Sequence, residues 1–383
     1  MYRPLPYLSI ILMLFIGLLT DRLHAQPFVV ADMDTGEILQ SNNMHQRWYP
    51  ASLTKLMTAY VTFQAIKAGE IYAGSPVTIS KAASRQPPSR MGYKQGVQIR
   101  IDTALKIIII KSANDVSLAL AEAVAGSLEA FIKRMNAQAE RLGLTNSQFA
   151  NSNGLHNANQ FSSARDMAVL SARIMNDFPQ YGEFYRAVAI KTPVRTHYSY
   201  NLLLERLPGT TGMKTGFVCA SGYNMVATAT LNGRRLVAVV LGRESQTDRA
   251  VSAAKLLRES VGANGNTNIF TEAPKGNAPR NMRPVLCTQE ARAQRYDPAA
   301  GNAVIKSKFL SPRQKSNLIL AANPGGVDSP PGNAWLTRKF TLRGSIPVPR
   351  ERPDFDPSTG KILLVAIGRK GTGSVAMPTP RPR

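Results

Sequence analysis

Ser52 and Lys55 form a Ser-x-x-Lys pair that could carry out nucleophilic catalysis. They lie in a segment, residues 50–61, whose apolar residues recur at helical spacing, so both side chains would emerge on one face. A serine hydroxyl becomes an effective nucleophile when a nearby base takes its proton, and burial beside another cation can lower a lysine pKa enough for that role. The helix N-terminus would also place the Ser52 backbone N–H beside a developing oxyanion. Taken alone, the pair fits an exposed helix surface equally well.

A second pair, Ser112 and Asn114, follows the apolar run 107–110. On its own a Ser-x-Asn sequence is typical of a turn or a helix cap. Beside an active serine, however, the hydroxyl could pass a proton. The carboxamide could both donate to and accept from a peptide bond.

Lys214-Thr215-Gly216 opens an extended stretch after a Gly-rich segment, residues 208–212. On an edge strand, the lysine and the threonine could bind a carboxylate. A glycine without a Cβ would let an extended peptide lie alongside the strand. The alternative interpretation is a simple turn at the start of a strand.

The order Ser-x-x-Lys, Ser-x-Asn, Lys-Thr-Gly, with gaps of about 60 and 100 residues, resembles the motif set of penicillin-recognising serine acyltransferases. Longer blocks around and between these motifs are similar to those of the low-molecular-mass D-alanyl-D-alanine carboxypeptidases over roughly residues 27–262. The blocks are Pro50-Ala51-Ser52-Leu53-Thr54-Lys55, Lys111-Ser112-Ala113-Asn114-Asp115, Asn153-Gly154-Leu155, Ser163-Ala164-Arg165-Asp166-Met167 and Gly212-Met213-Lys214-Thr215-Gly216-Phe217.

The resemblance implies an α/β (α+β) fold of the β-lactamase/transpeptidase-like type, in which an antiparallel sheet packs with a helical cluster. It implies a serine carboxypeptidase of cell-wall biosynthesis and remodelling that removes the terminal D-alanine from peptidoglycan stem peptides ending in D-Ala-D-Ala. β-Lactam antibiotics would be covalent inhibitors. Neither a metal nor an organic cofactor enters this chemistry.

Catalytic roles follow from the same resemblance. Ser52 would attack the carbonyl between the two D-alanines, and Lys55 would be the general base that activates it. Ser112 would relay the proton to the departing D-alanine, and Asn114 would orient the acyl amide. Water would then hydrolyse the acyl-enzyme.

Substrate contacts implied by the resemblance come mainly from the third motif. Lys214 and Thr215 would bind the terminal carboxylate, next to Gly216. The backbone N–H of Phe217 would complete the oxyanion hole with that of Ser52. Many relatives carry a threonine two residues after the glycine of this motif, where this chain has Val218. One hydroxyl is therefore missing beside the carboxylate site, whereas the acylating residues are not affected.

The first 25 residues are typical of a secretory signal peptide. Arg3 supplies a basic start, residues 8–19 are apolar, and Ala25 is a small residue at a cleavage position. About twelve apolar residues are too few to span a bilayer comfortably, which needs ~20. We therefore expect export to the periplasm or cell envelope with cleavage near Ala25. A retained N-terminal anchor is the alternative.

Residues 26–265 have the pattern of a mixed α/β catalytic domain. A hairpin is expected around Asp34-Thr35-Gly36, and a second around Asn232-Gly233. Further expected elements are helices at 103–110, 115–142, 163–177 and 247–260 and strands at 223–231 and 236–241.

The remaining residues, 266–383, differ in composition. The chain has 383 residues and a net charge of +23, and this stretch carries 19 Lys/Arg against 7 Asp/Glu with 15 of the 25 prolines. We expect a basic, Pro-rich extension, largely disordered or linker-like, with one strand-like run at 361–367. It could hold the protein to an anionic envelope surface. The final segment, 377–383, has too many prolines for an amphipathic anchoring helix.

A pI near 10.3 would also suit nucleic acid. The chain has no basic motif interleaved with aromatic residues, and an exported protein meets envelope polymers instead, so no nucleic-acid partner is expected. The two cysteines, Cys219 and Cys287, exclude a four-cysteine metal site. They could form a disulfide or remain two thiols. The four histidines show no paired helical spacing, so no metal site is expected.

Two other functions remain open from the residues. A serine β-lactamase on the same fold would need a water-positioning glutamate, and none is obvious after Asn153-Gly154-Leu155. A non-enzymatic, envelope-polymer-binding protein would explain the charge but not the three motifs.

Overall fold

The computed structural model describes residues 26–291, 307–314, 318–322, 354–356 and 361–363. The expected signal peptide and much of the basic extension lie outside the described residues. The chain divides into two compact units, residues 1–344 and 345–383. In the second unit, β11 (Asp354–Asp356) and β12 (Lys361–Leu363) form an antiparallel hairpin, and β12 covers the start of the expected run 361–367.

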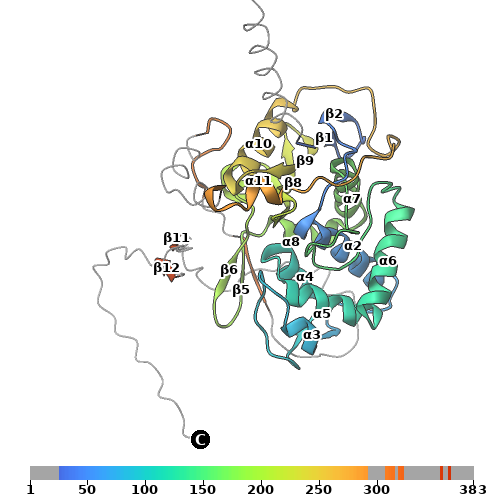
Figure 1. The fold of residues 1–383 in the computed structure, drawn as a ribbon, viewed down its shortest axis with the longest axis vertical. Helices are drawn as coiled ribbons and strands as arrows, with labels where there is room; N and C mark the ends of the chain where they lie inside the picture. The colour runs from blue at the N-terminus through green and yellow to red at the C-terminus, as the bar shows by residue number, and fades with distance from the viewer. Residues whose placement is uncertain (1–25, 292–306, 315–317, 323–353, 357–360, 364–383) are drawn as a thin grey trace, which may run out of the picture. The chain divides into compact units, whose positions relative to one another are not determined.

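A five-stranded antiparallel sheet, in the order β2-β1-β9-β8-β7, forms the centre of the first unit (Figure 1). Its strands are β1 (Phe28–Asp32), β2 (Ile38–Asn42), β7 (Thr210–Val218), β8 (Gly222–Leu231) and β9 (Arg234–Arg243). Both expected hairpins are confirmed. Asn232 and Gly233 have φ values of 48° and 81°, which the tight turn between two twisted strands requires. The order leaves β7 at an edge of this sheet.

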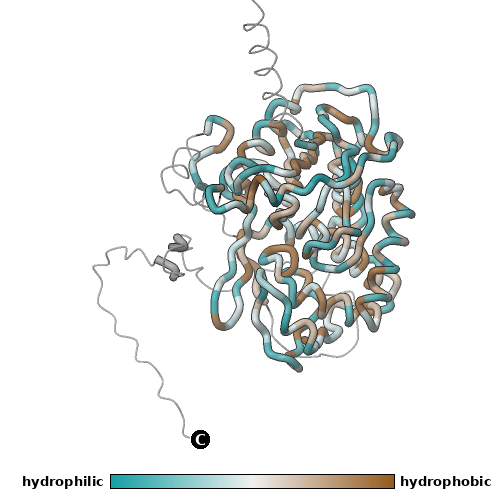
Figure 2. The backbone as a smooth tube through the Cα atoms, in the orientation of Figure 1, coloured by the Kyte–Doolittle hydropathy of each residue, from teal (hydrophilic) through white to brown (hydrophobic). Residues whose placement is uncertain are grey.

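Both faces of the sheet are buried, which explains why the run 236–241 is apolar without alternation. Leu236, Ala238 and Val240 pack toward α10 (Gln246–Glu259) and α9 (Leu203–Arg206). Val237, Val239 and Leu241 face the opposite way, into the main core with the helical cluster. Figure 2 shows hydrophobic stretches along the strands and along the helices that pack on them.

The helical cluster surrounds α2 (Thr54–Lys67), which follows a 3-10 turn, η1 (Ala51–Leu53). Eleven of the fourteen α2 residues are buried, so this helix lies inside the cluster rather than on its surface. The other helices of this part are α3 (Lys81–Ser84), α4 (Ile101–Ile110), α5 (Asn114–Ala125), α6 (Leu128–Arg141), α7 (Ala164–Asp177), η2 (Pro179–Tyr181) and α8 (Gly182–Arg186). Short strands β3 (Pro76–Thr78) and β4 (Gln98–Arg100) form one small pair, and β5 (Ala189–Lys191) and β6 (Thr196–Tyr198) form another.

The expected helices at 103–110, 163–177 and 247–260 are confirmed as α4, α7 and α10. Ser163 and Ser245 cap the last two by accepting from Asp166 N–H and Asp248 N–H. The single helix expected over 115–142 is wrong, because it divides into α5 and α6. Gly126 ends α5 in the left-handed conformation, with φ at 77°, and Ser127 starts α6 by capping Ala130 N–H.

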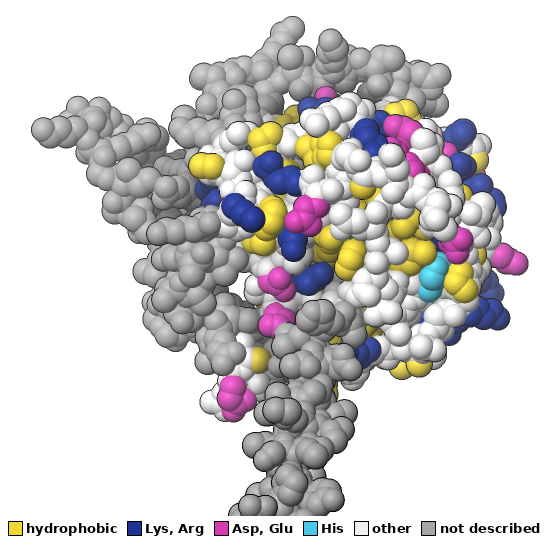
Figure 3. Space-filling view, turned by 90° about the horizontal axis from the view of Figure 1, so that it is seen from above, with side chains coloured by type: hydrophobic (Ala, Val, Ile, Leu, Met, Phe, Trp, Pro, Cys, Tyr) yellow, Lys and Arg dark blue, Asp and Glu magenta, His cyan; other side chains and the backbone are white. Residues whose placement is uncertain are grey.

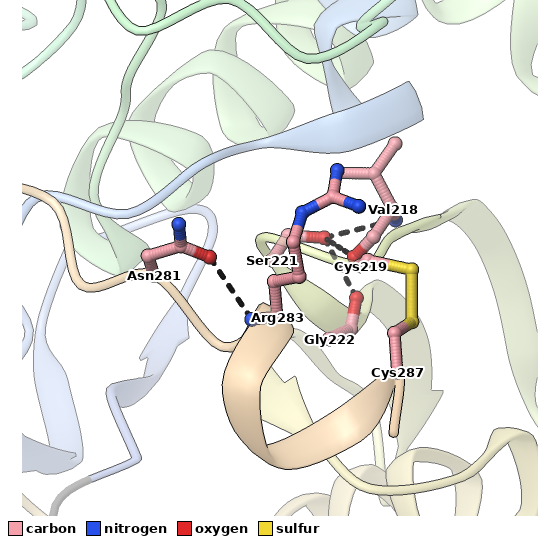
Figure 4. Close-up of a disulfide and its surroundings, with 7 residues drawn as sticks. All are labelled: Val218, Cys219, Ser221, Gly222, Asn281, Arg283 and Cys287. Carbon is pink, nitrogen blue, oxygen red and sulfur yellow. Dashed lines mark hydrogen bonds between the residues drawn. A yellow bond between two sulfur atoms is a disulfide. The ribbon is translucent and has the colours of Figure 1, made fainter. Parts of the chain in front are cut away.

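Residues 266–287, here called the strap, lie against the sheet and the helices of the first unit and make fixed contacts that composition did not predict. Ile269 is fully buried, and its carbonyl accepts from Arg165 Nε at 2.6 Å. The strap ends at α11 (Arg283–Leu286), where Cys287 forms a disulfide with Cys219 (Figure 4). The bridge, which the sequence left open, joins the strap to the turn after β7.

Two later segments also pack on this unit. β10 (Ile319–Ala321) pairs in parallel with β5, and Ser311 N–H donates to the Arg206 carbonyl at 2.8 Å. Backbone groups make these contacts, so a polar, proline-rich composition does not reveal them. The division at residue 265 stays a prediction.

Among the described residues, no helix is both long and apolar enough to cross a membrane. Figure 3 shows one face of the molecule on which Lys and Arg side chains lie among Asp and Glu side chains. That face therefore presents mixed charge rather than a patch of one sign.

Candidate active site

Ser52 lies in η1, half-buried, at the entrance to the central helix α2. The preceding residue, Ala51, has φ at 49°, a conformation that costs free energy unless its surroundings hold it. Asn224 on β8 helps to do so, because its Nδ2 donates to the carbonyls of Tyr49 at 2.9 Å and Pro50 at 3.3 Å. The sheet therefore positions the segment that carries the serine.

Lys55, one turn further along, is completely buried. Its Nζ lies 3.2 Å from Ser52 Oγ, 2.8 Å from Asn114 Oδ1 and 2.5 Å from the Asn153 carbonyl oxygen. Burial, and next the positive charge of Lys214, hold the pKa of Lys55 well below its ordinary value, while Asp115 acts in the opposite direction. A lysine in this state can accept the proton of Ser52.

Ser112 and Asn114 lie at the junction between α4 and α5. Ser112 is in the left-handed region, with φ at 62°, and its Oγ accepts from Lys214 Nζ at 2.9 Å. Asn114 is the first residue of α5, and its Nδ2 donates to the Pro87 carbonyl at 2.9 Å. The second motif therefore contacts both buried lysines, through Asn114 on one side and Ser112 on the other.

Lys214, Thr215 and Gly216 lie inside the edge strand β7, which begins at Thr210, earlier than the sequence indicated. An added Cβ at Gly216 would lie 3.0 Å from both the Pro50 carbonyl oxygen and the Ser52 backbone nitrogen. Only glycine lets the strand come this close to the serine without displacing a backbone.

Lys214 is also buried, and burial together with the nearby Arg249 guanidinium lowers its pKa to about 7. Arg249, in the first turn of α10, donates from Nη2 to the Tyr200 carbonyl at 2.9 Å. Its buried Nε has no hydrogen-bond partner among the described residues. Two cations at the inner side of β7 suit the carboxylate-binding role that the sequence assigned to Lys214.

Phe217, directly after the motif, is 37% exposed, and its ring lies 4.2 Å from that of Tyr223 on β8. The backbone N–H of Val218 donates to Ser221 Oγ in the turn that holds Cys219 (Figure 4). The end of the motif strand is thus connected directly to the turn that carries the disulfide.

Sequence reasoning gave no role to Asn153, whose carbonyl accepts from Lys55. The signal was present in the block Asn153-Gly154-Leu155. Gly154 has φ at 85°, and an added Cβ would lie 1.9 Å from the Ala51 carbonyl oxygen, so the block packs against the serine segment. Gln86, which accepts a hydrogen bond from Asn153, lies in no motif that would have marked it in the sequence.

Within the described part of the chain, no group of three or more His, Cys, Asp or Glu side chains is arranged to hold a metal ion. The side chains that converge are two serines, two lysines and an asparagine. A sheet packed with a helical cluster, carrying these groups from three separate motifs, defines a serine enzyme of the penicillin-recognising class.

Comparisons with known proteins define the family within that class. The model of the D-alanyl-D-alanine carboxypeptidase family matches residues 18–245. D-alanyl-D-alanine carboxypeptidase DacA from Haemophilus influenzae is 37% identical over 264 residues, which cover 68% of this chain and 67% of that relative. This chain belongs to the D-alanyl-D-alanine carboxypeptidase family of serine peptidases.

Solved structures agree with the fold. Penicillin-binding protein 5 from Haemophilus influenzae superimposes with a TM-score of 0.59 at 36% identity, covering 62% of this chain and 71% of that one. Penicillin-binding protein D2 from Listeria monocytogenes, in a cefotaxime-bound form, has a TM-score of 0.56 at 26% identity, covering 62% and 97%. The chain spans 60 to 67% of the length of three curated carboxypeptidases.

Proposed function

We propose that this chain is a serine D-Ala-D-Ala carboxypeptidase that removes the terminal D-alanine from peptidoglycan stem peptides in the cell envelope. The observation that carries the proposal is the contact between Lys55 Nζ and Ser52 Oγ at 3.2 Å, with the amine fully buried and its pKa lowered. The family match supports the same chemistry and does not favour a β-lactamase or a non-enzymatic polymer-binding protein.

Acylation begins when Ser52 Oγ attacks the carbonyl carbon between the two D-alanines while Lys55 takes the hydroxyl proton. The negative charge on the carbonyl oxygen is stabilised by the backbone N–H groups of Ser52 and Phe217. The intermediate collapses with cleavage of the C–N bond. The leaving D-alanine nitrogen receives, through Ser112, the proton that Lys55 took from Ser52, so Lys55 is neutral again and an ester remains on Ser52.

Deacylation transfers the acyl group from Ser52 to water. Lys55 accepts a proton from the attacking water, and the Ser52 oxygen leaves with a proton, which restores the starting enzyme. With water as the second substrate, the protons of both steps are carried by Lys55, Ser52 and Ser112.

Substrate recognition depends on the terminal carboxylate. Lys214 and Thr215 would bind this group, and the nearby Arg249 adds positive potential. Asn114 would bind the acyl amide. Gly216 leaves room for the peptide to run along the edge strand. β-Lactams, which carry a carboxylate beside a strained amide, would acylate the same serine.

Release of D-alanine tests this function. The purified protein should release D-alanine from a peptide ending in D-Ala-D-Ala and should release no L-alanine from the same peptide ending in L-Ala-L-Ala. Ser52→Ala should reduce the rate by about 10⁴-fold or more, with a far-UV spectrum like that of the parent. Undiminished release by Ser52→Ala would contradict the assignment of the nucleophile.

We infer that residues 1–25 direct export and that the basic extension holds the enzyme to anionic envelope polymer. The support is the composition of these segments, which carry an apolar run and the excess of Lys and Arg. The charge would concentrate the enzyme near its substrate through long-range attraction.

A further inference from the structure

Lys55 has an unusual set of hydrogen-bond partners for a general base. Two of its three polar neighbours are carbonyl oxygens, Asn114 Oδ1 at 2.8 Å and the Asn153 backbone oxygen at 2.5 Å. The third is Ser52 Oγ at 3.2 Å. A neutral amine has two N–H groups and one lone pair. When both N–H groups donate to the carbonyls, the lone pair is left for the serine hydroxyl.

Both carbonyl acceptors are held by one stretch of chain, residues 86–92, here called the rim segment. The Pro87 carbonyl accepts from Asn114 Nδ2 at 2.9 Å, which orients Asn114 Oδ1 toward Lys55. Gln86 Oε1 accepts from Asn153 Nδ2, also at 2.9 Å. Asn153 Oδ1 in turn accepts from Leu155 N–H at 3.0 Å, so the Asn153 side chain is fixed at both ends.

Hydrogen bonds also fix the rim segment itself, so the backbone that carries Gln86 is held in place. The Ser89 carbonyl accepts from Asn114 N–H at 2.7 Å, and the Asp115 carboxylate accepts from Gly92 N–H at 2.9 Å. The Gln86 carbonyl accepts from Arg90 Nη1 at 3.3 Å. These contacts fix the rim segment against the start of α5.

We propose that Gln86 is a positioning residue for the general base: its side chain fixes Asn153, and Asn153 holds Lys55 so that its lone pair faces Ser52. The inference rests on the proposed function, since it assumes that Lys55 is the base. Gln86 lies 67 residues from Asn153 and is joined to it by one side-chain contact. Among the described hydrogen bonds, Asn153 is the link between Gln86 and Lys55.

The pKa of Lys55 depends on the charged groups around it, so a substitution at Gln86 that adds a charge can be told apart from one that only removes the hydrogen-bond acceptor. Lys214 faces the amine from β7, and Asp115 acts on it from α5, where Tyr93 also lies near that carboxylate. Arg90 contacts the Gln86 backbone. Gln86→Glu keeps an oxygen acceptor for Asn153 Nδ2 and adds one negative charge. Gln86→Ala removes the acceptor and adds no charge.

The test measures the rate of penicillin acylation and of D-alanine release against pH for Gln86→Ala, Gln86→Glu and Gln95→Ala. Gln95, an exposed residue a few positions along, is the control. Gln86→Ala should lower the plateau kcat by about 10-fold with little change in KM, because general-base catalysis depends on the direction of the base. Gln86→Glu should keep the parent plateau within about 2-fold, with the acid limb moved to higher pH by the added charge.

Thermal unfolding of each variant separates positioning from folding. A parent-like plateau in a folded Gln86→Ala protein would overturn the proposal. Equal losses of activity in Gln86→Ala and Gln86→Glu, with equal falls in Tm, would also overturn it, because they would assign Gln86 a purely structural role. If the parent protein itself were not acylated at Ser52, the proposed function would fail, and that result is read from the parent alone.

Discussion

Two buried lysines within one site explain how this chain could use lysine both as a base and as an anchor. Burial and nearby positive charge lower the pKa of both Lys55 and Lys214 below the ordinary value for a lysine. Lys55 must be neutral to accept the serine proton, whereas Lys214 must be charged to attract a carboxylate. In a plot of rate against pH, the acid limb should therefore report the titration of Lys55. The alkaline limb should report the titration of Lys214.

The alkaline limb should respond to Arg249. The pKa of Lys214 is about 7 because of burial and the Arg249 charge, so kcat/KM should fall as pH rises through about 7. Arg249→Gln removes that charge, raises the pKa of Lys214 and moves the limb to higher pH, even if the maximal rate falls. Arg258→Gln, on the exposed side of the same helix, is the control. An unmoved limb in Arg249→Gln would contradict the coupling.

Gly216 should be irreplaceable for a steric reason. Gly216→Ala would bring a Cβ within 3.0 Å of the Pro50 carbonyl oxygen and the Ser52 nitrogen, which are both backbone atoms. Displacement of β7 from the serine should reduce penicillin acylation by about 100-fold. Gly182→Ala, where nothing lies within 4 Å of the new Cβ, should acylate at the parent rate. Parent-like acylation by Gly216→Ala would show that the strand can move without loss.

At the scale of elements, the disulfide joins the strap to the turn after β7 across 68 residues of sequence. Closing such a loop restricts the unfolded chain and contributes about 2–4 kcal/mol to stability. Urea unfolding should show a loss of this size when the parent is reduced, or when Cys219 and Cys287 are both replaced by Ser. The double variant should not respond to reductant. A parent midpoint that reduction leaves unchanged would rule out this contribution.

Much of the element order was predictable, because hairpin turns and serine caps are local signals. Asn232-Gly233 specifies its turn through positive φ values, and Ser163 and Ser245 mark helix starts. The break at Gly126 was missed, since the apolar pattern continues on both sides of it. The three motifs supply most of the residues that meet at the candidate site, although their mutual contacts depend on tertiary packing.

Long-range contacts through ordinary residues were not predictable. Gln86 meets Asn153 only because the rim segment and the 151–155 loop approach each other in space. The strap was also hard to predict, since many of its hydrogen bonds are made by backbone groups, such as the Ile269 carbonyl that accepts from Arg165, and any residue could supply such a group.

At the scale of the whole molecule, most of the residues that give the net charge of +23 lie outside the candidate active site. Among site residues, Lys55 and Lys214 are buried, and they cannot act as surface adhesion groups. The second unit, residues 345–383, carries seven Lys/Arg against three Asp/Glu. Adhesion and catalysis should therefore be separable by truncation.

A chain that ends at Gly344 keeps every described contact of the first unit. It should release D-alanine at the parent rate and sediment less with purified peptidoglycan in low salt. Raising the salt should reduce the difference between the two proteins, since exposed charges are screened. Equal sedimentation of both proteins at low salt would argue against adhesion through this segment.

The central claim is that Ser52, activated by Lys55, forms an acyl-enzyme. Intact mass after penicillin treatment, followed by peptide mapping, tests it most directly. We predict a mass increase equal to one penicillin, located on the peptide that contains Ser52, which persists for minutes and is absent in Ser52→Ala. Rapid turnover of penicillin without a lasting adduct, or an adduct on another residue, would contradict the account.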